Sequence, residues 1–383
     1  MFKEKLNHER VKQIHQPRSK EKLSVFSNSK AKGLSTTLSE YIPSEDMPWN
    51  KKRVAHAIRR LKFGLHFSEF EPALNQTPTN FIDTIIDEAI NAEMPTPPDW
   101  VEKTPPPWGS SDAEVLEYFS TNYDLYIGYQ TEWTDLMKAH PFREKMTLFW
   151  HNHFVTEIGK YEHAPLAHQH FTMLRTYALG NFKDFVHAVG LDSAMLIYLD
   201  GIENVKGEPQ ENYARELLEL FTMGIGNYTQ NDITEIARAL TGYYFDYFNL
   251  ETGFANNRHD TGEKTFFERT GTFGYDEVID IIFEERAEEI AHYICTKLYK
   301  FFVYETPNES IISELSQLFI DENFEIEPVI RKLLKSEHFF DESILGAMIK
   351  SPIDLMLGDG SKKLGYQSPK SKELATIPPH CVI

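Results

Sequence analysis

Four polar residues recur at helical spacing within residues 211–228, ENYARELLELFTMGIGNY. At about 100° per residue, as in an α-helix, they share one stripe about 100° wide, formed by Asn212, Arg215, Glu216 and Glu219. Glu216 and Glu219 could act as general acid or base, while Arg215 could stabilise negative charge. The same side chains could instead form i, i+4 ion pairs, which contribute only about 0.2–0.5 kcal/mol on an exposed helix.

Two histidines in WHNHF, residues 150–154, suggest a second reactive group. On a helix His151 and His153 would lie about 200° apart, so they cannot bind one ion together from that helix. His153 shares its face with apolar residues. It is interpreted either as a hydrogen-bonded core histidine or as a buried acid, base or metal ligand completed from elsewhere, with Glu157 as the nearest local partner.

A further histidine cluster occurs in EHAPLAHQH, at His163, His168 and His170. Its spacing matches no zinc-binding pattern, and surface positions are expected for these side chains. The cofactor is therefore left open, with a divalent metal as one alternative.

The segment RHDTGEKTF, residues 258–266, is predicted to be a loop whose ionisable groups include Arg258, His259, Asp260 and Lys264. His259 beside Asp260 could serve as a base or a ligand, and Lys264 could stabilise negative charge. The His-Asp pair is short and common in proteins, so it is weak evidence when taken alone.

The elements that would position these groups are mainly helices. Gly224 and Gly226 are expected to end the helix of the opening segment, and a capping box of Thr229 and Asp232 begins the next. A long helix is predicted from about Ser111 to His140, and Pro141 opens the one after it. Aromatic and β-prone residues at 243–250 and 262–274 predict a small β-hairpin around residues 243–274. The predicted fold class is mainly α, a single compact multi-helix domain with this hairpin inserted.

Composition excludes several classes of protein. The 383 residues carry a net charge of 39 − 58 = −19, so binding to nucleic acid is not expected. Cys295 and Cys381 are too few and too far apart for a disulfide framework or a cysteine-based zinc site. No apolar run reaches the length of a transmembrane segment, and the N-terminus lacks the apolar core of a signal peptide. The chain as written is therefore expected in the cytoplasm.

Three regions are predicted along the chain. Residues 1–45 form a flexible basic arm, 46–360 a helical domain, and 361–383 an irregular tail.

Several segments occur in the order seen in a large bacterial family. They are RVAHAIRRLKFG, FWHNHF, LRTYALGNFKDF, SAMLIYLDG, ENYARELLELFTMGIGNYTQNDITEIARALTGY, HDTGEKTFF and KLYKFFVYETP. The chain resembles the domain-of-unknown-function family 1800 (DUF1800) over about residues 49–355. Its motif positions are Trp150, His151, Asn152, His153, Asn212, Arg215, Glu216, Glu219, Arg238, Thr241, Gly242, His259, Asp260 and Lys264.

This resemblance implies a mostly helical domain without an established activity. Members are often exported, and they are commonly encoded beside a second uncharacterised family that looks like sulfatases and alkaline phosphatases, which suggests a partner protein. Members usually continue to a Pro- and Trp-containing ending, whereas residues 359–383, DGSKKLGYQSPKSKELATIPPHCVI, suggest a truncated or altered C-terminus.

Two functions are expected for the polar residues. In a hydrolase-like enzyme or small-molecule binder, the catalytic candidates are Glu216, Glu219, Arg215, His153 and His259. The substrate-binding candidates are Asn212, Asn152, Arg238, Asp260 and Lys264. In a non-catalytic binding or assembly partner, the same residues would form a buried network that specifies the arrangement of the helices.

Overall fold

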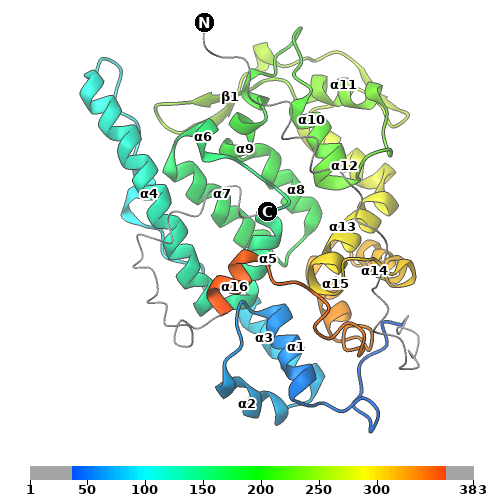
Figure 1. The fold of residues 1–383 in the computed structure, drawn as a ribbon. Helices are drawn as coiled ribbons and strands as arrows, with labels where there is room; N and C mark the ends of the chain where they lie inside the picture. Colours follow the sequence, from blue (N-terminus) through cyan, green and yellow to red (C-terminus); the bar gives the residue numbers. More distant parts are fainter. Residues whose placement is uncertain (1–36, 359–383) are drawn as a thin grey trace, which may run out of the picture. The chain divides into compact units, whose positions relative to one another are not determined.

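The computed structural model describes residues 37–358, which lie within one compact unit of the chain (Figure 1). These residues form sixteen α-helices and two small antiparallel sheets, which confirms the predicted mainly α class. No helix in this part of the chain is both long enough and apolar enough to cross a membrane.

The helices and strands have the following bounds. The first eight α-helices are α1 (Lys51–Leu61), α2 (Phe70–Leu74), α3 (Pro78–Ile90), α4 (Asp112–Ala139), α5 (Pro141–His151), α6 (Ile158–Tyr161), α7 (Ala164–Tyr177) and α8 (Phe182–Leu191). The next eight are α9 (Ser193–Tyr198), α10 (Asn212–Glu216), α11 (Gln230–Ala239), α12 (Tyr275–Glu285), α13 (Ala287–Phe302), α14 (Glu309–Asp321), α15 (Ile326–Leu334) and α16 (Pro352–Gly358). Short 3₁₀ helices are η1 (Phe67–Glu69), η2 (Asp99–Glu102), η3 (Gly201–Glu203) and η5 (Asn256–Arg258), and η4 (Leu217–Thr222) is a π-helix. The strands are β1 (Tyr243–Asp246), β2 (Glu251–Phe254), β3 (Lys264–Phe266) and β4 (Arg269–Gly271).

Local signals in the sequence explain where several helices begin. Ser111 caps α4 together with Glu114, so this helix has the predicted bounds almost to the residue. Thr229 and Asp232 form the expected capping box of α11, and Pro141 opens α5. These beginnings depend on contacts within one helical turn, which is why they could be predicted from the sequence.

Helix α5 lies among α1, α3, α4 and α7, and all its residues from Phe142 to Trp150 are buried. The ring nitrogen of Trp150 donates to the Ala178 carbonyl at 2.9 Å, so even its one polar atom is paired. The end of α5 therefore places Trp150 in the core, and His153 and Phe154, which follow the helix, are also buried.

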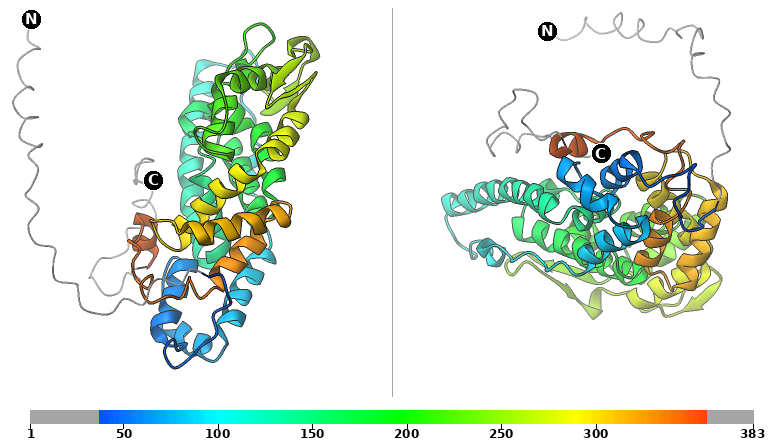
Figure 2. Two further views of the ribbon diagram at one scale, coloured as in Figure 1. Left: turned by 90° about the vertical axis from the view of Figure 1, so that its right-hand side faces the viewer. Right: turned by 90° about the horizontal axis from the view of Figure 1, so that it is seen from below.

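Helix α13 packs against α14 and α15, the yellow and orange helices of Figure 2, and also against the π-helix η4. Its buried stripe includes Ile290, Ile294 and Leu298. Two polar residues of α13, Tyr293 and Lys297, face the π-helix and are central to the site described below.

The predicted hairpin region holds two hairpins. Strand β1 pairs with β2, which follows the first strand-like segment, and β3 pairs with β4 within the second segment. The second hairpin turns at Phe267 and Glu268, whose positive φ angles of 46° and 64° suit a tight two-residue turn. Asp232 accepts the Phe267 N–H at 2.9 Å and thereby secures this turn against α11.

The end of the predicted N-terminal arm is packed where it is described. Leu38 and Tyr41 are buried, and the Tyr41 ring lies 4.6 Å from that of Phe340. Residues 37–45 therefore belong to the folded unit. The rest of the arm and the predicted tail, residues 361–383, lie outside the described residues.

Candidate functional site

The opening segment is a helix of two kinds rather than the uniform α-helix expected from the sequence. Residues 212–216 are α-helical and residues 217–222 are π-helical. The Met223 N–H reaches back five residues to the Leu218 carbonyl at 3.2 Å, as a π-helix requires. The 100° spacing therefore fails beyond Glu216, although Gly224, with φ of +79°, ends the helix as predicted. Short π-helical turns occur frequently at functional sites.

The guanidinium group of Arg215 is bonded to neighbouring side chains. It contacts Glu211 at 3.0 Å, Gln230 at 3.1 Å and Glu219 at 3.5 Å. The side chains of Arg215 and Glu219 are 37% and 22% exposed, so this is a half-exposed ion pair between α10 and the π-helix. The hydrogen bond to Gln230 joins α10 to α11. The contacts match the interpretation of ordinary ion pairing for Arg215 and Glu219.

Glu216 differs from its neighbours because one of its oxygens has no partner. Its Oε2 atom is buried and accepts no hydrogen bond from the described residues. Burial raises the pKa of the Glu216 carboxyl; the charge of Glu219 adds to the rise, while Arg215 opposes it. Glu216 is therefore readier than an ordinary glutamate to carry a proton.

His153 is buried, with 5% of its surface exposed, and both ring nitrogens are bonded. Nε2 lies 3.0 Å from the Phe221 carbonyl, and Nδ1 lies 2.9 Å from the Lys297 Nζ. Nε2 therefore donates to the carbonyl, while Nδ1 accepts from the lysine. Burial, followed by the nearby Lys297 charge, holds the pKa of His153 well below its ordinary value, which agrees with a neutral ring.

Lys297 was not among the residues singled out from the sequence. Burial lowers its pKa to about 8. Within residues 37–358 it has no carboxylate partner, and its only hydrogen bond is to His153. The overlooked signal is a lysine one helical turn after Tyr293, beside the apolar stripe of α13.

Tyr293 joins Lys297 to the π-helix. Its hydroxyl donates to the Leu220 carbonyl at 3.2 Å, and the Lys297 Nζ lies 4.7 Å from the centre of its ring. Burial and then the charge of Glu216 raise the pKa of the Tyr293 hydroxyl, so Glu216 acts on the same face. We call Glu216, Tyr293, Lys297 and His153 the π-helix cluster.

An open groove of about 830 Å³ adjoins this cluster. Tyr293, Thr296 and Gly224 contribute to its lining. The buried Oγ1 of Thr296 has no hydrogen-bond partner in the described part of the chain. The groove thus offers space for a small molecule beside Tyr293.

The predicted residues of α11 and the following loop form a separate arrangement. Arg238 donates to Asp260 at 2.9 Å and to both oxygens of Glu235 at 2.8 and 2.9 Å. Lys264, 1% exposed, donates to the carbonyls of Asp260 and Phe273. We call Arg238, Glu235, Asp260 and Lys264 the α11 network.

The α11 network also binds the backbone around it. Glu235 accepts the Thr265 N–H at 3.0 Å, and Asp260 accepts the Gly262 N–H at 2.8 Å. Burial would raise the pKa of Asp260, but the Gly262 N–H and Arg238 outweigh it and leave the pKa below its ordinary value. His259 lies beside the network, with its Nδ1 atom 2.8 Å from the Thr241 carbonyl.

The two asparagines lie at the surface. Asn212 is exposed and donates to Asp200 at 2.6 Å. Asn152 is also exposed, and its side chain bonds with His151. The described hydrogen bonds connect neither asparagine to the π-helix cluster, so the ten predicted residues do not converge on one site.

The second histidine cluster is buried, contrary to the surface positions expected. His163, His168 and His170 are 4%, 8% and 0% exposed, because α7 packs against α4, α5 and α9. His170 contacts Asp192 at 2.9 Å and the Phe154 carbonyl at 3.1 Å. In the described part of the chain, no three His, Cys, Asp or Glu side chains are grouped so that they could hold a metal ion.

Fold and site together define a mainly α-helical protein with a polar cluster built around a π-helix. Residues 56–371 match the family described as "Protein of unknown function (DUF1800)", and the chain belongs to this family, as its motifs indicated. Searches of curated proteins and of solved structures found no match. The family description names no activity, so the argument for function depends on the geometry of this chain.

Proposed function

We propose that this protein is an enzyme that uses the π-helix cluster for proton transfer on a small polar substrate. The observation that supports this most directly is the pairing of Lys297, a cation without a carboxylate partner among the described residues, with a neutral His153. Glu216, with its unpartnered buried oxygen, supplies a second proton-exchanging group on the same face.

Lys297 suits the role of general base. An amine with a pKa of about 8 is partly unprotonated near neutral pH, so it can accept a proton and later return it. His153 cannot supply the proton donor that a substrate oxygen would need, because its one N–H is bonded to the Phe221 carbonyl. We therefore assign His153 as a positioning residue for Lys297.

Glu216 suits the role of general acid. Burial raises the pKa of its carboxyl above the ordinary glutamate value, which is the direction that a general acid needs. A general base and a general acid are sufficient for hydrolysis, which is the reaction class proposed here. Of the four cluster residues, Tyr293 lines the adjoining groove.

A purely structural role accounts for only part of the cluster. Tyr293 and His153 satisfy the carbonyls of Leu220 and Phe221, two acceptors left over at the end of a helix. That role does not require a lysine without a counter-charge or a carboxyl oxygen without a donor, both of which cost free energy when buried. These two features favour a functional site.

For the α11 network we propose a supporting role. Arg238, Asp260 and Lys264 have their hydrogen-bonding groups directed at one another or at the backbone, which leaves little capacity for a substrate. These residues would fix the two hairpin segments against α11.

The proposal is tested with the purified full chain and three chromogenic probes: p-nitrophenyl acetate, p-nitrophenyl phosphate and p-nitrophenyl sulfate. We expect hydrolysis of at least one probe, with a rate that rises as pH increases through about 8. Lys297→Met should reduce kcat by about 100-fold or more and Glu216→Gln by about 10-fold or more, the range typical of acid–base groups.

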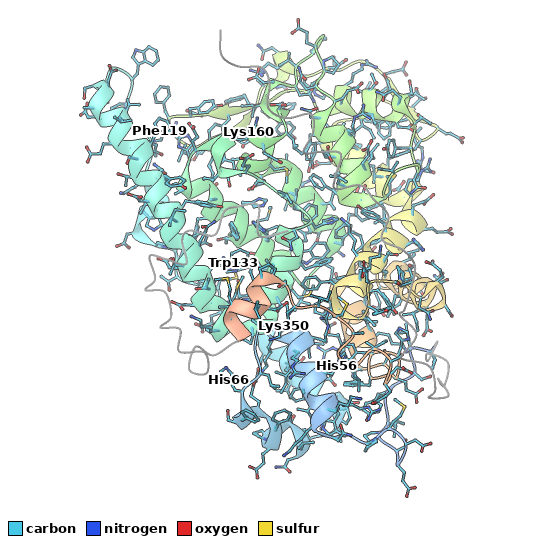
Figure 3. All side chains as sticks on the ribbon, viewed as in Figure 1. His56, His66, Phe119, Trp133, Lys160 and Lys350 are labelled. Carbon is cyan, nitrogen blue, oxygen red and sulfur yellow. The ribbon has the colours of Figure 1, made fainter. Side chains whose placement is uncertain are left out.

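The matched control is Lys160→Met on α6, an exposed lysine labelled in Figure 3, which should leave the rate unchanged. Absence of turnover with all three probes, or equal rates for wild type and Lys297→Met, would overturn the enzyme proposal. The cluster would then be a structural feature of a non-catalytic protein, such as the partner of a sulfatase- or phosphatase-like protein that the resemblance suggests.

A further inference from the structure

A second concave site lies away from the π-helix cluster, between α1 and the segment that leads into α16. It is a cavity of about 460 Å³, and its polar lining residues are Lys52, His56, Arg59, Arg60, Lys350 and Asp354. His56 and Lys350 are labelled in Figure 3, and both views of Figure 2 place α16 beside the blue N-terminal helices. We call this cavity the basic pocket.

The charges around the basic pocket are unbalanced. Asp354 is the one acidic residue in its lining, and it is already paired with Lys145 at 2.8 Å. Arg59 and Lys350 are exposed and form no ion pair with the described residues. In a chain of net charge −19, this concentration of positive charge is a local exception that favours an anion.

Two further cationic side chains, Arg60 and Lys52, line the basic pocket. Arg60 donates to the carbonyls of Phe302, at 2.7 Å, and Phe301, so it is fixed in place without being neutralised. Lys52 forms an exposed ion pair with Glu342, a type of contact that contributes little to stability.

His56 provides an independent indication of a ligand. Its side chain is 5% exposed, and its Nε2 atom has no hydrogen-bond partner within residues 37–358. Burial, and then the charge of Arg60, lowers the pKa of His56 to about 3, so the ring is neutral. The backbone carbonyl of Phe339 accepts a hydrogen bond from the other ring nitrogen, which carries the proton of the neutral ring, so Nε2 presents a lone pair.

We infer that the basic pocket binds a small oxyanion that also carries a hydroxyl group, with Arg59, Arg60 and Lys350 facing the negative charge and Nε2 of His56 accepting a hydrogen bond from the hydroxyl. Monohydrogen phosphate and phosphate monoesters in their singly protonated form have this chemistry. Sulfate has the same shape and charge but no proton to donate.

Positions at the end of α1 explain only part of this arrangement. Arg59 and Arg60 lie in the last turn of the helix, where basic residues interact favourably with the helix dipole. That interaction accounts for neither the cavity nor a buried acceptor without a donor, whose desolvation costs about 1–3 kcal/mol. A ligand hydroxyl would remove this cost.

The test is isothermal titration calorimetry of the full chain at pH 7 with inorganic phosphate and, separately, with sulfate. We expect phosphate to bind at least tenfold more tightly than sulfate. Arg59→Met and Lys350→Met should each weaken phosphate binding several-fold. Both residues are exposed, so neither substitution should prevent folding. Lys51→Met, on the same helix but outside the pocket lining, should change nothing.

The histidine is tested with His56→Phe, which retains a ring against Phe339 and Phe340 and removes the acceptor. Its phosphate affinity should fall to the level of sulfate, provided that thermal unfolding shows a folded variant. The inference is overturned if neither anion binds, if sulfate binds as tightly as phosphate to the wild type, or if Arg59→Met and Lys350→Met bind phosphate unchanged.

Discussion

The α11 network and the π-helix cluster both contain charged side chains from the motif-bearing segments or from helices packed against them. The two regions differ in how fully these charged groups are paired. In the α11 network, Arg238 contacts two carboxylates and Lys264 contacts two carbonyls. In the π-helix cluster, Lys297 has no carboxylate among the described residues, and Glu216 has an oxygen without a donor. Buried polar groups are normally paired, so the cluster is the exception that calls for a functional explanation.

This difference bears on how polar motifs are interpreted. A residue type that a family motif requires can serve the fold or the chemistry, and its hydrogen-bond partners distinguish the two. Substitutions in the two regions should therefore affect different properties of the protein. Changes in the α11 network should cost stability, and changes in the π-helix cluster should cost function with little loss of stability.

The largest effect on stability is expected from Lys264→Met. The substitution leaves the carbonyls of Asp260 and Phe273 without their buried donor, which should lower the free energy of unfolding by about 2–4 kcal/mol. Equilibrium denaturation in urea measures this loss. The neighbouring exposed residue provides the control, because Glu263→Gln should leave the urea midpoint unchanged. If Lys264→Met shifted the midpoint no more than this control, the α11 network would not be structural.

An intermediate effect, dependent on pH, is expected from Lys297→Met. Burial lowers the pKa of Lys297 from the ordinary lysine value of 10.5 to about 8. Between these values the unfolded chain binds more protons than the folded one, so this lysine makes stability rise with pH. Between pH 8 and 10, the free energy of unfolding of the wild type should therefore rise by about 1–2 kcal/mol relative to that of the variant. This range allows for partial exposure of the side chain. Denaturation of both proteins at each pH tests the sign, and parallel pH curves would show that Lys297 is protonated throughout.

The smallest effect on stability is expected from Glu216→Gln. The substitution removes a partly buried charge while preserving the shape of the side chain, so the free energy of unfolding should change by less than about 0.5 kcal/mol. Thermal unfolding at pH 7 provides the measurement, with Asp260→Asn as the contrasting variant that should lose stability. A large loss in Glu216→Gln would place Glu216 in a structural network and remove the difference between the two regions.

Much of the architecture could be predicted from the sequence because its signals are local. The capping residues of α4 and α11, the proline of α5 and Gly224 after the π-helix act within one or two turns of the chain. The strand-like segments were also recognised. One small hairpin was expected around residues 243–274, and the structure has two, because β1 pairs with β2 beyond the first strand-like segment while β3 and β4 pair within the second.

The candidate site was predicted in part. Glu216 and His153 were recognised from their type and position, whereas Lys297 and Tyr293 were missed because they lie about 140 residues beyond His153 in the chain. His163, at the N-cap of α7, and His168 and His170 within it were assigned to the surface because nothing near them in the sequence shows which helices cover them.

By itself, the sequence determined a mainly α-helical chain of the DUF1800 family, with its candidate polar residues in a few segments. Only the tertiary structure decided which of those charges are paired. Hydrogen-bond partners such as Lys297 for His153, and Asp260 for Arg238, come from distant segments that packing brings together. The π-helix also depends on tertiary contacts, because its end carbonyls accept hydrogen bonds from side chains of α13 and of the residues after α5.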